Sequence, residues 1–174
     1  LGVAVLIIVM SVMNGFRTEL INKIVGFNSH ITVKTYGKSI DEKKIKKKTL
    51  KLISENMIFS NSGEAIILKN GISKGVVLRG YSKDDFSSLE IVKNEKFEGN
   101  KKQLNRNFIS IGNELSFSLN LKIGDELILM SPSGVQTIIG SMPKQKTFLV
   151  TSIYNSGLAE FDNNIAFINL STHE

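Results

Sequence analysis

The sequence predicts an α+β fold that follows the end of a transmembrane helix. Two observations lead to this prediction. The chain opens on an uncharged apolar run, and from residue 29 onward its hydrophobic period changes between roughly two and about 3.6 residues. A chain of 174 residues, 41% of them hydrophobic, suits one domain or two small ones. The absence of cysteine excludes disulfides and thiolate metal sites.

The apolar run from Leu1 to Met13 carries no charge. At about 1.5 Å per residue it covers roughly 20 Å, which is short of a bilayer core of about 30 Å. We expect the C-terminal part of a transmembrane helix that continues as an amphipathic extension to residue 27. A wholly buried helix is the alternative, whereas a signal peptide would need a basic start and a cleavage site. The basic excess between Arg17 and Lys51 points to the cytoplasm, but this rule is weak for long domains.

Residues 31–35 alternate like a strand, and an amphipathic helix is expected after them. Ser39 and Glu42 have the spacing of a capping box at the start of that helix. Its lysines, Lys43–Lys51, mostly lie off the apolar face, so they form a solvated side. A nucleic-acid site there is the less favoured interpretation, because no aromatic residue lies between the lysines.

Strands are expected at residues 65–69 and 75–79, joined by a turn at Asn70 and Gly71. A polar crossing near residue 93 separates them from the second half of the chain. A weaker helix is expected before this crossing, at 84–89. After the crossing we expect a helix at 113–119 and strands at 108–111, 126–130, 147–155 and 164–170. We therefore predict one subdomain from 28–92 plus 156–174, with a second, 93–155, inserted into it.

Catalytic motifs are missing from the sequence. There is no P-loop, no G-x-S-x-G elbow and no histidine pair at metal-ligand spacing. Asp84 with Asp85, and Asp125 with Glu126, are adjacent carboxylates that suit helix caps or turns better than acid–base catalysis. We expect a non-catalytic chain without metal or cofactor.

The loop at residues 132–147 is long for a small β-rich unit, and long loops are usually functional or disordered. This loop is apolar and has a proline near each end, Pro132 and Pro143. It is expected to be a surface that a partner covers. The alternative is a plain hairpin extension packed on its own domain.

Two stretches resemble the LolC/LolE family, the membrane subunits of the lipoprotein-releasing ABC transporter of Gram-negative bacteria. They are "LIIVMSVMNGFRTELINKIVGFNSHI" and "IGNELSFSLNLKIGDELILMSPSGVQTIIGSMPKQKTFLV". The resemblance implies a MacB-like periplasmic domain, with a porter-like α/β subdomain and an inserted β-rich sabre-like subdomain. It implies an inner-membrane subunit, mostly periplasmic in this region, with no nucleic-acid partner.

The resemblance also implies partners and site residues. The partners would be a LolA-type carrier, a LolD-type ATPase, a second LolC/LolE-type subunit and the lipoprotein itself. The carrier-binding hook would comprise Thr137, Ile138, Ile139, Gly140, Met142 and Pro143, and the neighbouring pad Gln145 and Lys146. Ile138 replaces a proline of the family pattern, and Ile128 stands at a third pad position that is basic in the family. A hook argues for a LolC or LolF type over LolE. Possible lining residues of a lipid cavity are Val9, Met13 and Phe16.

Two other functions stay open at this stage. An export permease of the MacB type would share the domain but lack a carrier-docking loop. A soluble module that binds nucleic acid through Lys43–Lys51 would have no transmembrane helix.

Overall fold

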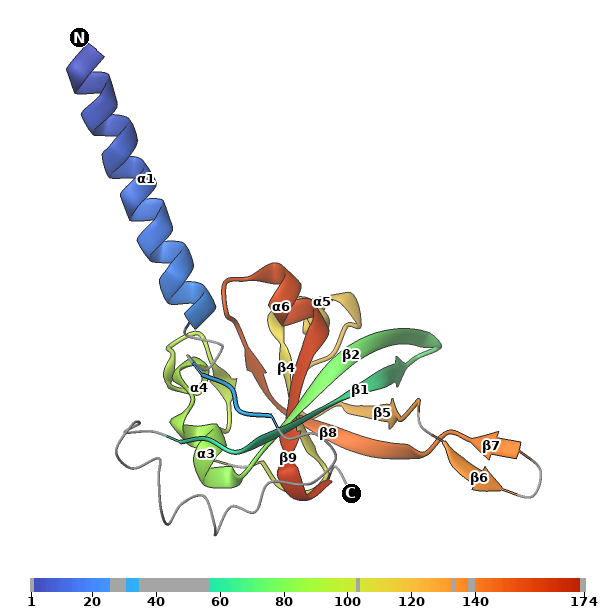
Figure 1. The fold of residues 1–174 in the computed structure, drawn as a ribbon. Helices are drawn as coiled ribbons and strands as arrows, with labels where there is room; N and C mark the ends of the chain where they lie inside the picture. The colour runs from blue at the N-terminus through green and yellow to red at the C-terminus, as the bar shows by residue number, and fades with distance from the viewer. Residues whose placement is uncertain are drawn as a thin grey trace. The chain divides into compact units, whose positions relative to one another are not determined.

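The computed structural model describes residues 2–25, 31–34, 57–102, 104–132, 134–137 and 140–172. The chain forms two compact units, Leu1–Lys34 and Thr35–Glu174. The first contains one long helix, and the second contains a strongly curved β-sheet with short helices (Figure 1). The helix expected at residues 39–53, with its lysines, lies outside the described residues.

Helix α1 covers Gly2–Val25, so the helix expected within residues 1–27 is present. Its segment Gly2–Ile21 has a mean hydropathy of 1.6 and is long and apolar enough to cross a membrane, by length and composition. None of that segment is buried within the structure. An apolar helix that is exposed on all sides is not the core helix of its own unit.

The prediction of a strand at residues 31–35 is wrong for residues 31–34, which the structure describes. Residues 31–34 form no strand in the structure, and Ile31 and Val33 are exposed. Alternation of apolar and polar residues creates a strand only where a neighbouring strand completes the ladder, and local sequence does not supply that neighbour.

The second unit is a closed barrel. Its strands are β1 (Ser60–Lys69), β2 (Ile72–Tyr81), β4 (Phe108–Gly112), β5 (Glu126–Met130), β8 (Gln145–Tyr154) and β9 (Ile165–Asn169). The sheet order is β3-β8-β4-β9-β2-β1-β5, and β5 also pairs with β8, which closes the ring. The short strand β3 (Glu98–Gly99) pairs with β8 as well. The pairs β2–β9 and β4–β8 are parallel, and the others are antiparallel.

Every strand expected between residues 57 and 172 is present. The turn between β1 and β2 is also confirmed, because Asn70 has a φ of 50° and Gly71 a φ of 81°. Both residues adopt the positive φ that a two-residue hairpin turn requires. The helix expected at 84–89 is α3 (Lys83–Ser88), followed at once by α4 (Glu90–Lys93), and the helix expected at 113–119 is α5 (Asn113–Ser118).

One hydrophobic core fills the barrel. It combines side chains from the six strands of the ring and from α5 and the turn after it, including Ile67 of β1, Ile111 of β4, Val150 of β8 and Ala166 of β9, each fully buried. The boundaries expected at 92/93 and 155/156 therefore coincide with no break in the sheet or its core. Sequence composition located the polar crossing at residue 93, but strand pairing joins the segments on either side of it.

A second packed layer lies on the outside of the barrel, under α3 and α4. Phe86 of α3 packs edge-on against Phe97 and Phe167, with ring centroids 6.2 and 6.0 Å apart, and Tyr154 lies 4.8 Å from Phe167. Ser82 starts α3, since its hydroxyl accepts the N–H of Asp85 at 3.1 Å. The segment between β2 and β4, which contains α3 and α4, thus buries part of the outer face of the sheet.

Two buried serines, Ser110 and Ser152, lie side by side on neighbouring strands beneath this aromatic layer. A register shift follows Ile109, after which Ser110 of β4 pairs with Ser152 of β8. Because neighbouring Ile109 and Ile111 point into the barrel core, Ser110 points to the outer layer. Neither serine hydroxyl has a hydrogen-bond partner among the described residues.

The helix α6 (Ala159–Asn164) is not expected from the sequence, and it packs against α5. The carboxylate of Asp162 is buried and accepts the N–H of Ser156 at 3.0 and 3.1 Å. Burial raises the pKa of Asp162, and the hydrogen bonds from Ser156 only partly offset it. A short 3-10 turn, Leu170–Thr172, follows β9.

Candidate docking hairpin

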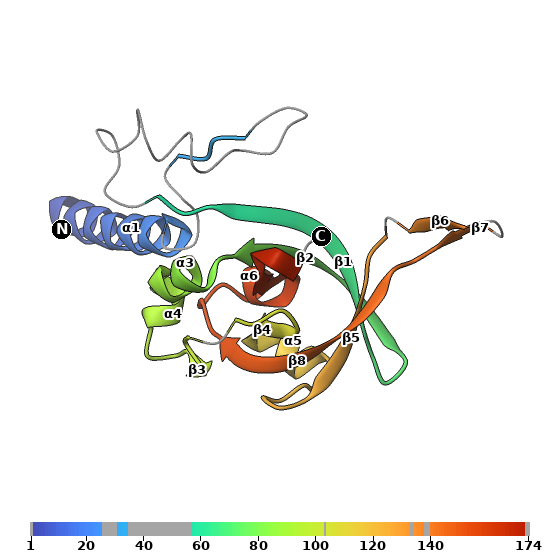
Figure 2. The same ribbon diagram turned by 90° about the horizontal axis from the view of Figure 1, so that it is seen from below.

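The expected hook at residues 132–147 is part of a hairpin arm that starts with β5 and returns as β8. Beyond the β5–β8 ladder, β6 (Val135–Thr137) pairs with β7 (Gly140–Met142), with Val135 opposite Met142 and Thr137 opposite Gly140. Figure 2 shows this ribbon extending away from the barrel. Among the described elements, β6 and β7 make their substantial contacts only with each other. The described part of the ribbon therefore gives no support to the alternative of an extension packed on its own domain.

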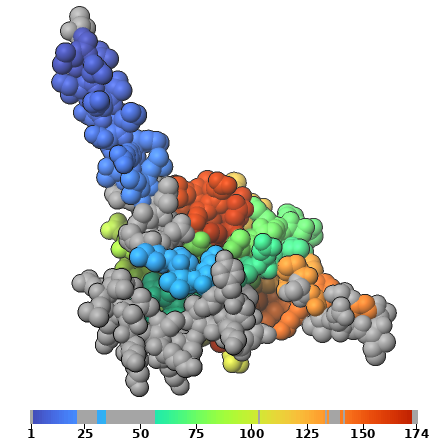
Figure 3. Space-filling model, viewed as in Figure 1, coloured from blue at the N-terminus to red at the C-terminus, as the bar shows by residue number. Residues whose placement is uncertain are grey.

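The hook residues that the structure describes are accessible. Met142 is 62% exposed, and Pro143 is exposed too. Gly140 has a φ of 125°, a conformation that only glycine adopts without strain. The backbone conformation therefore explains why the expected hook has a glycine at this position. Ile138 and Ile139 lie outside the described residues, and of Thr137 only the backbone is described. In Figure 3 the strands of the arm form a projection from the space-filling surface.

The expected pad residues lie on opposite faces of β8. Gln145 stands opposite Met130, and Lys146 stands opposite Leu129, which is buried. Directly paired residues share a face of the sheet, and consecutive residues alternate. Gln145 therefore faces outward, whereas Lys146 lies on the core-facing side, just beyond the end of the core.

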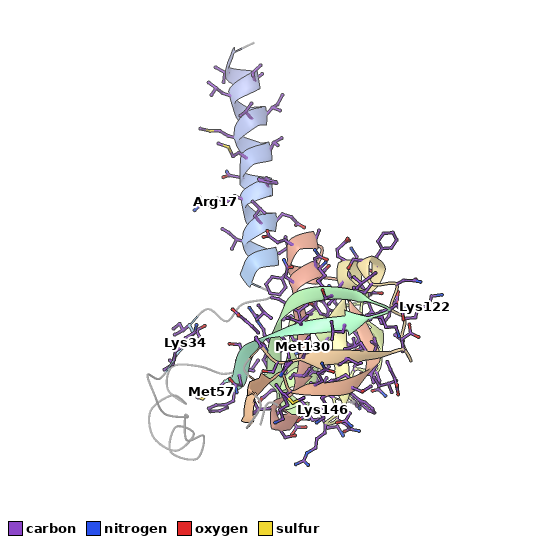
Figure 4. The ribbon with its side chains drawn as sticks, turned by 90° about the vertical axis from the view of Figure 1, so that its right-hand side faces the viewer. Arg17, Lys34, Met57, Lys122, Met130 and Lys146 are labelled. Atoms are coloured by element: carbon purple, nitrogen blue, oxygen red, sulfur yellow. The ribbon has the colours of Figure 1, made fainter. Side chains whose placement is uncertain are left out.

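The ammonium group of Lys146 has a partner within its own strand. Its Nζ lies 5.7 Å from the centroid of the Phe148 ring, two residues further along β8, which is the range of a cation–π contact. Figure 4 views the molecule from the side of the arm and labels Met130 and Lys146 on the neighbouring strands. The pad thus consists of two separate surfaces, one outward and one along the barrel rim.

Ile128, at the third pad position, joins the outward surface. It is 38% exposed and stands opposite Leu68 of β1 and Thr147 of β8. From Leu127 to Ala159 the sequence contains no acidic residue, and its only charges are Lys144 and Lys146. The arm is therefore apolar and positively charged.

Shallow grooves continue from the root of the arm and were not expected from the sequence. One is lined by Ile66, Val77 and Pro132, with Glu64 at its side. Another reaches from Val77 along α6 to Phe161. Their residues come from the β1–β2 hairpin, from Pro132 and from α6 with its neighbours, which are far apart in the sequence, so no local pattern could have found them.

The expected lining residues of α1 share one side of that helix. Val9, Met13 and Phe16 follow at intervals of four and three residues and are 52%, 65% and 64% exposed. Elsewhere, the described residues contain no group of three or more His, Cys, Asp or Glu side chains that could hold a metal ion. The histidines His30 and His173 lie outside the described residues.

No protein-family model matches the chain. Three curated relatives are the "Lipoprotein-releasing system transmembrane protein LolC" of different bacteria. Identity is 24% over 176 residues in Xylella fastidiosa, 26% over 178 in Neisseria meningitidis and 29% over 179 in Haemophilus influenzae. Each match covers 98% of this chain, and the chain spans 42% to 43% of the length of these relatives.

Among solved structures, the extracellular domain of the noncanonic ABC-type transporter YknZ from Gram-positive bacteria aligns with a TM-score of 0.42 at 11% identity. The alignment covers 66% of this chain and 54% of that one, and a TM-score below 0.5 does not establish a common fold. The sequence matches, however, run from the apolar helix through the arm to the last strand. The chain is therefore similar over nearly its whole length to LolC, and the predicted resemblance to the LolC/LolE family is confirmed.

Proposed function

We propose that this chain is the first transmembrane helix and the periplasmic domain of a permease subunit that releases lipoproteins from the inner membrane. The observation that carries the proposal is the combination of near-complete similarity to LolC with an apolar, basic hairpin that projects from the barrel. The relatives are named transmembrane proteins of a lipoprotein-releasing system, and α1 has the length and composition of a membrane span.

In this proposal the subunit performs no chemistry itself. A separate LolD-type chain hydrolyses ATP, and a second LolC/LolE-type subunit completes the membrane part. Residues 28–92 with 156–174 correspond to the porter-like part of a MacB-like domain and residues 93–155 to its sabre-like part, and strands from both ranges share the barrel. The side of α1 that carries Val9, Met13 and Phe16 faces the lipid chains of the substrate, which an exposed apolar stripe would accommodate.

The hook is proposed to bind the LolA-type periplasmic carrier. The exposed thioether of Met142 and the neighbouring Ile138 and Ile139 provide apolar contact, and Gln145 orients the arm on its outward face. Lys146 is held by the Phe148 ring, so its charge is preorganised at the rim of the barrel. An apolar tip with a basic root suits a partner that has an apolar cavity entrance with acidic residues beside it.

The first test uses a photocrosslinking amino acid at Met142 in the full-length protein in its own membrane, together with the purified carrier. The same amino acid at Phe117, which is 87% exposed on α5, is the control because it lies outside the hook. We expect a carrier adduct at residue 142 and none at residue 117. Equal adducts at both positions, or none in a folded transporter, would refute docking at the hook and favour a MacB-like export permease.

The second test separates the roles of tip and root. Ile138→Asp combined with Ile139→Asp should abolish carrier binding, because it puts charge into an apolar contact. Lys146→Ala should weaken binding, whereas Lys122→Ala, which removes another exposed charge on the loop before β5, should not. Circular dichroism of each variant reports whether the fold is retained. Normal binding by the double aspartate variant would contradict the proposal.

A further inference from the structure

The outer face of the barrel beside the arm has two complete rows of paired residues. Strands β2, β1, β5 and β8 are neighbours in that order, and each row crosses all four of them. Ile67, Leu129 and Phe148 fill the core, so the residues next to them on their strands point outward. From β2 to β8, one row is Gly75, Ile66, Met130 and Gln145, and the other is Ser73, Leu68, Ile128 and Thr147.

The centre of this face is apolar. It consists of Ile66 and Leu68 on β1 and of Ile128 and Met130 on β5, which together form the outer apolar surface. Ile128 is 38% exposed, and the other three side chains are half-buried. An antiparallel sheet with one face toward water normally places polar residues on that face. Four apolar side chains on adjacent strands therefore mark a surface that another molecule covers.

The border of the outer apolar surface is polar or small, and it carries no charge on β2 or β8. The border residues there are exposed, and they are Gly75, Ser73, Gln145 and Thr147. Charged side chains come one outward position further along, with Glu64 on β1 and Glu126 on β5. An apolar centre without charge inside a polar rim is the composition of a protein–protein interface.

The outer apolar surface is continuous with the arm. Met130 opposite Gln145 is the last pair of the β5–β8 ladder, and the same two strands lead on into the β6–β7 ribbon. One of the shallow grooves lies at this junction, and its lining joins Ile66 and Gly75 to Pro132 at the root of the arm. A protein seated on the arm is therefore next to β1 as well as to β5 and β8.

We propose that the outer apolar surface binds the same protein as the hook, so that the carrier docks on β1 as well as on the arm. This inference rests on the proposed function, and it extends the docking site to a strand outside the expected hook and pad. The carrier contributes an apolar, uncharged region that packs against Ile66 and Leu68. Because this contact involves no charge, its strength does not depend on salt, unlike a contact made by Lys146.

The first experiment places a photocrosslinking amino acid at Leu68 in the full-length protein in its own membrane, with the purified carrier added. The control position is Phe117, which is 87% exposed on α5 and lies outside the surface. We expect a carrier adduct at residue 68 and none at residue 117. This experiment leaves the rest of the outer apolar surface unchanged.

The second experiment measures the affinity of the purified carrier for the full-length protein in lipid nanodiscs. Ile66→Thr should weaken binding at least about fivefold, because Ile66 lies at the centre of the proposed contact. The matched control is Ile123→Thr, the same change at a 44% exposed residue on the loop before β5, which should alter affinity less than about twofold. The loss from Ile66→Thr should be equal at low and high salt, whereas the loss from Lys146→Ala should shrink at high salt. Circular dichroism reports whether each variant is folded.

The outcomes distinguish this inference from docking at the hook. A carrier adduct at residue 142 without one at residue 68 overturns the wider surface and leaves the hook in place. An adduct at residue 68 without one at residue 142 supports the surface and refutes the hook, and no adduct at either position overturns both. An adduct at residue 68 with a second membrane subunit or with another part of this chain, in place of the carrier, overturns the inference. Unchanged carrier affinity of a folded Ile66→Thr variant overturns it as well.

Discussion

Gly112, the last residue of β4 and the N-cap of α5, offers a direct test of the packing around the barrel. Its φ of −75° is available to any residue, so only space explains a glycine there. A Cβ at this position would lie 2.1 Å from the carbonyl oxygen of Asp162 and 2.5 Å from its Cα. These are backbone atoms of α6, which cannot rotate away as a side chain would. Gly112→Ala must therefore push α6 off the end of the barrel.

The cost follows from the size of the overlap. Overpacking a tight site typically costs about 1–3 kcal/mol, and occasionally more. An overlap with backbone that also displaces the buried Asp162 belongs at the upper end, about 3 kcal/mol. For a domain of this size, 1 kcal/mol changes the melting temperature by about 4 °C. Gly112→Ala should therefore lower the melting temperature by about 12 °C.

The assay is thermal unfolding of the detergent-solubilised chain, followed by circular dichroism. The matched control is Gly75→Ala on β2, where a Cβ would meet nothing within 4 Å. That variant should change stability by less than about 1 kcal/mol, because alanine mainly restricts the unfolded chain. Equal melting temperatures for the two variants would refute the close approach of β4 and α6, and with it the described packing of α6 against the barrel.

Three further predictions concern single side chains. The raised pKa of Asp162 means that the folded state binds its proton more tightly than the unfolded state, so this group's contribution to stability falls as pH rises above about 4. Asp162→Asn should flatten that part of the urea unfolding free energy between pH 4 and 7, and a pH-independent difference from the native protein would contradict this. Ser110→Ala removes a buried hydroxyl without a described partner and should raise the unfolding free energy by about 1 kcal/mol, whereas a loss of that size would reveal a partner. Lys146→Ala loses its contact with Phe148 and should cost about 0.5–1 kcal/mol in urea unfolding at low salt, and no change would refute the cation–π contact.

Local sequence patterns were sufficient for most individual elements. The strands at 65–69 and 126–130 and the turn at Asn70 and Gly71 follow from alternation and from residues that tolerate positive φ. The apolar character of α1 follows from composition alone. The short helix α6 was missed, since Phe161 and its neighbours show too few turns for a helical period to emerge.

The candidate docking hairpin was likewise predicted only in part from the sequence. Sequence resemblance predicted a hook at residues 132–147, where the structure has a hairpin, and Gly140 has the positive φ that its position in the hairpin requires. It did not predict that Gln145 and Lys146 face opposite sides of β8, because the strand was expected to begin only at residue 147. Which of the two lies on the core-facing side depends on the partner residues that stand opposite. Nor did the resemblance predict that four residues separate β5 from β6 while two separate β7 from β8.

Local patterns of residues are enough to predict the apolar helix, the strands, the tight turn and the stretch that forms the arm. They do not predict that strands from residues 60–81, 108–154 and 165–169 close one barrel around one core, because strand pairing is non-local. A strand's period fixes which residues share a face, but the partner that completes its ladder, and hence which face is buried, depends on segments far away in the chain.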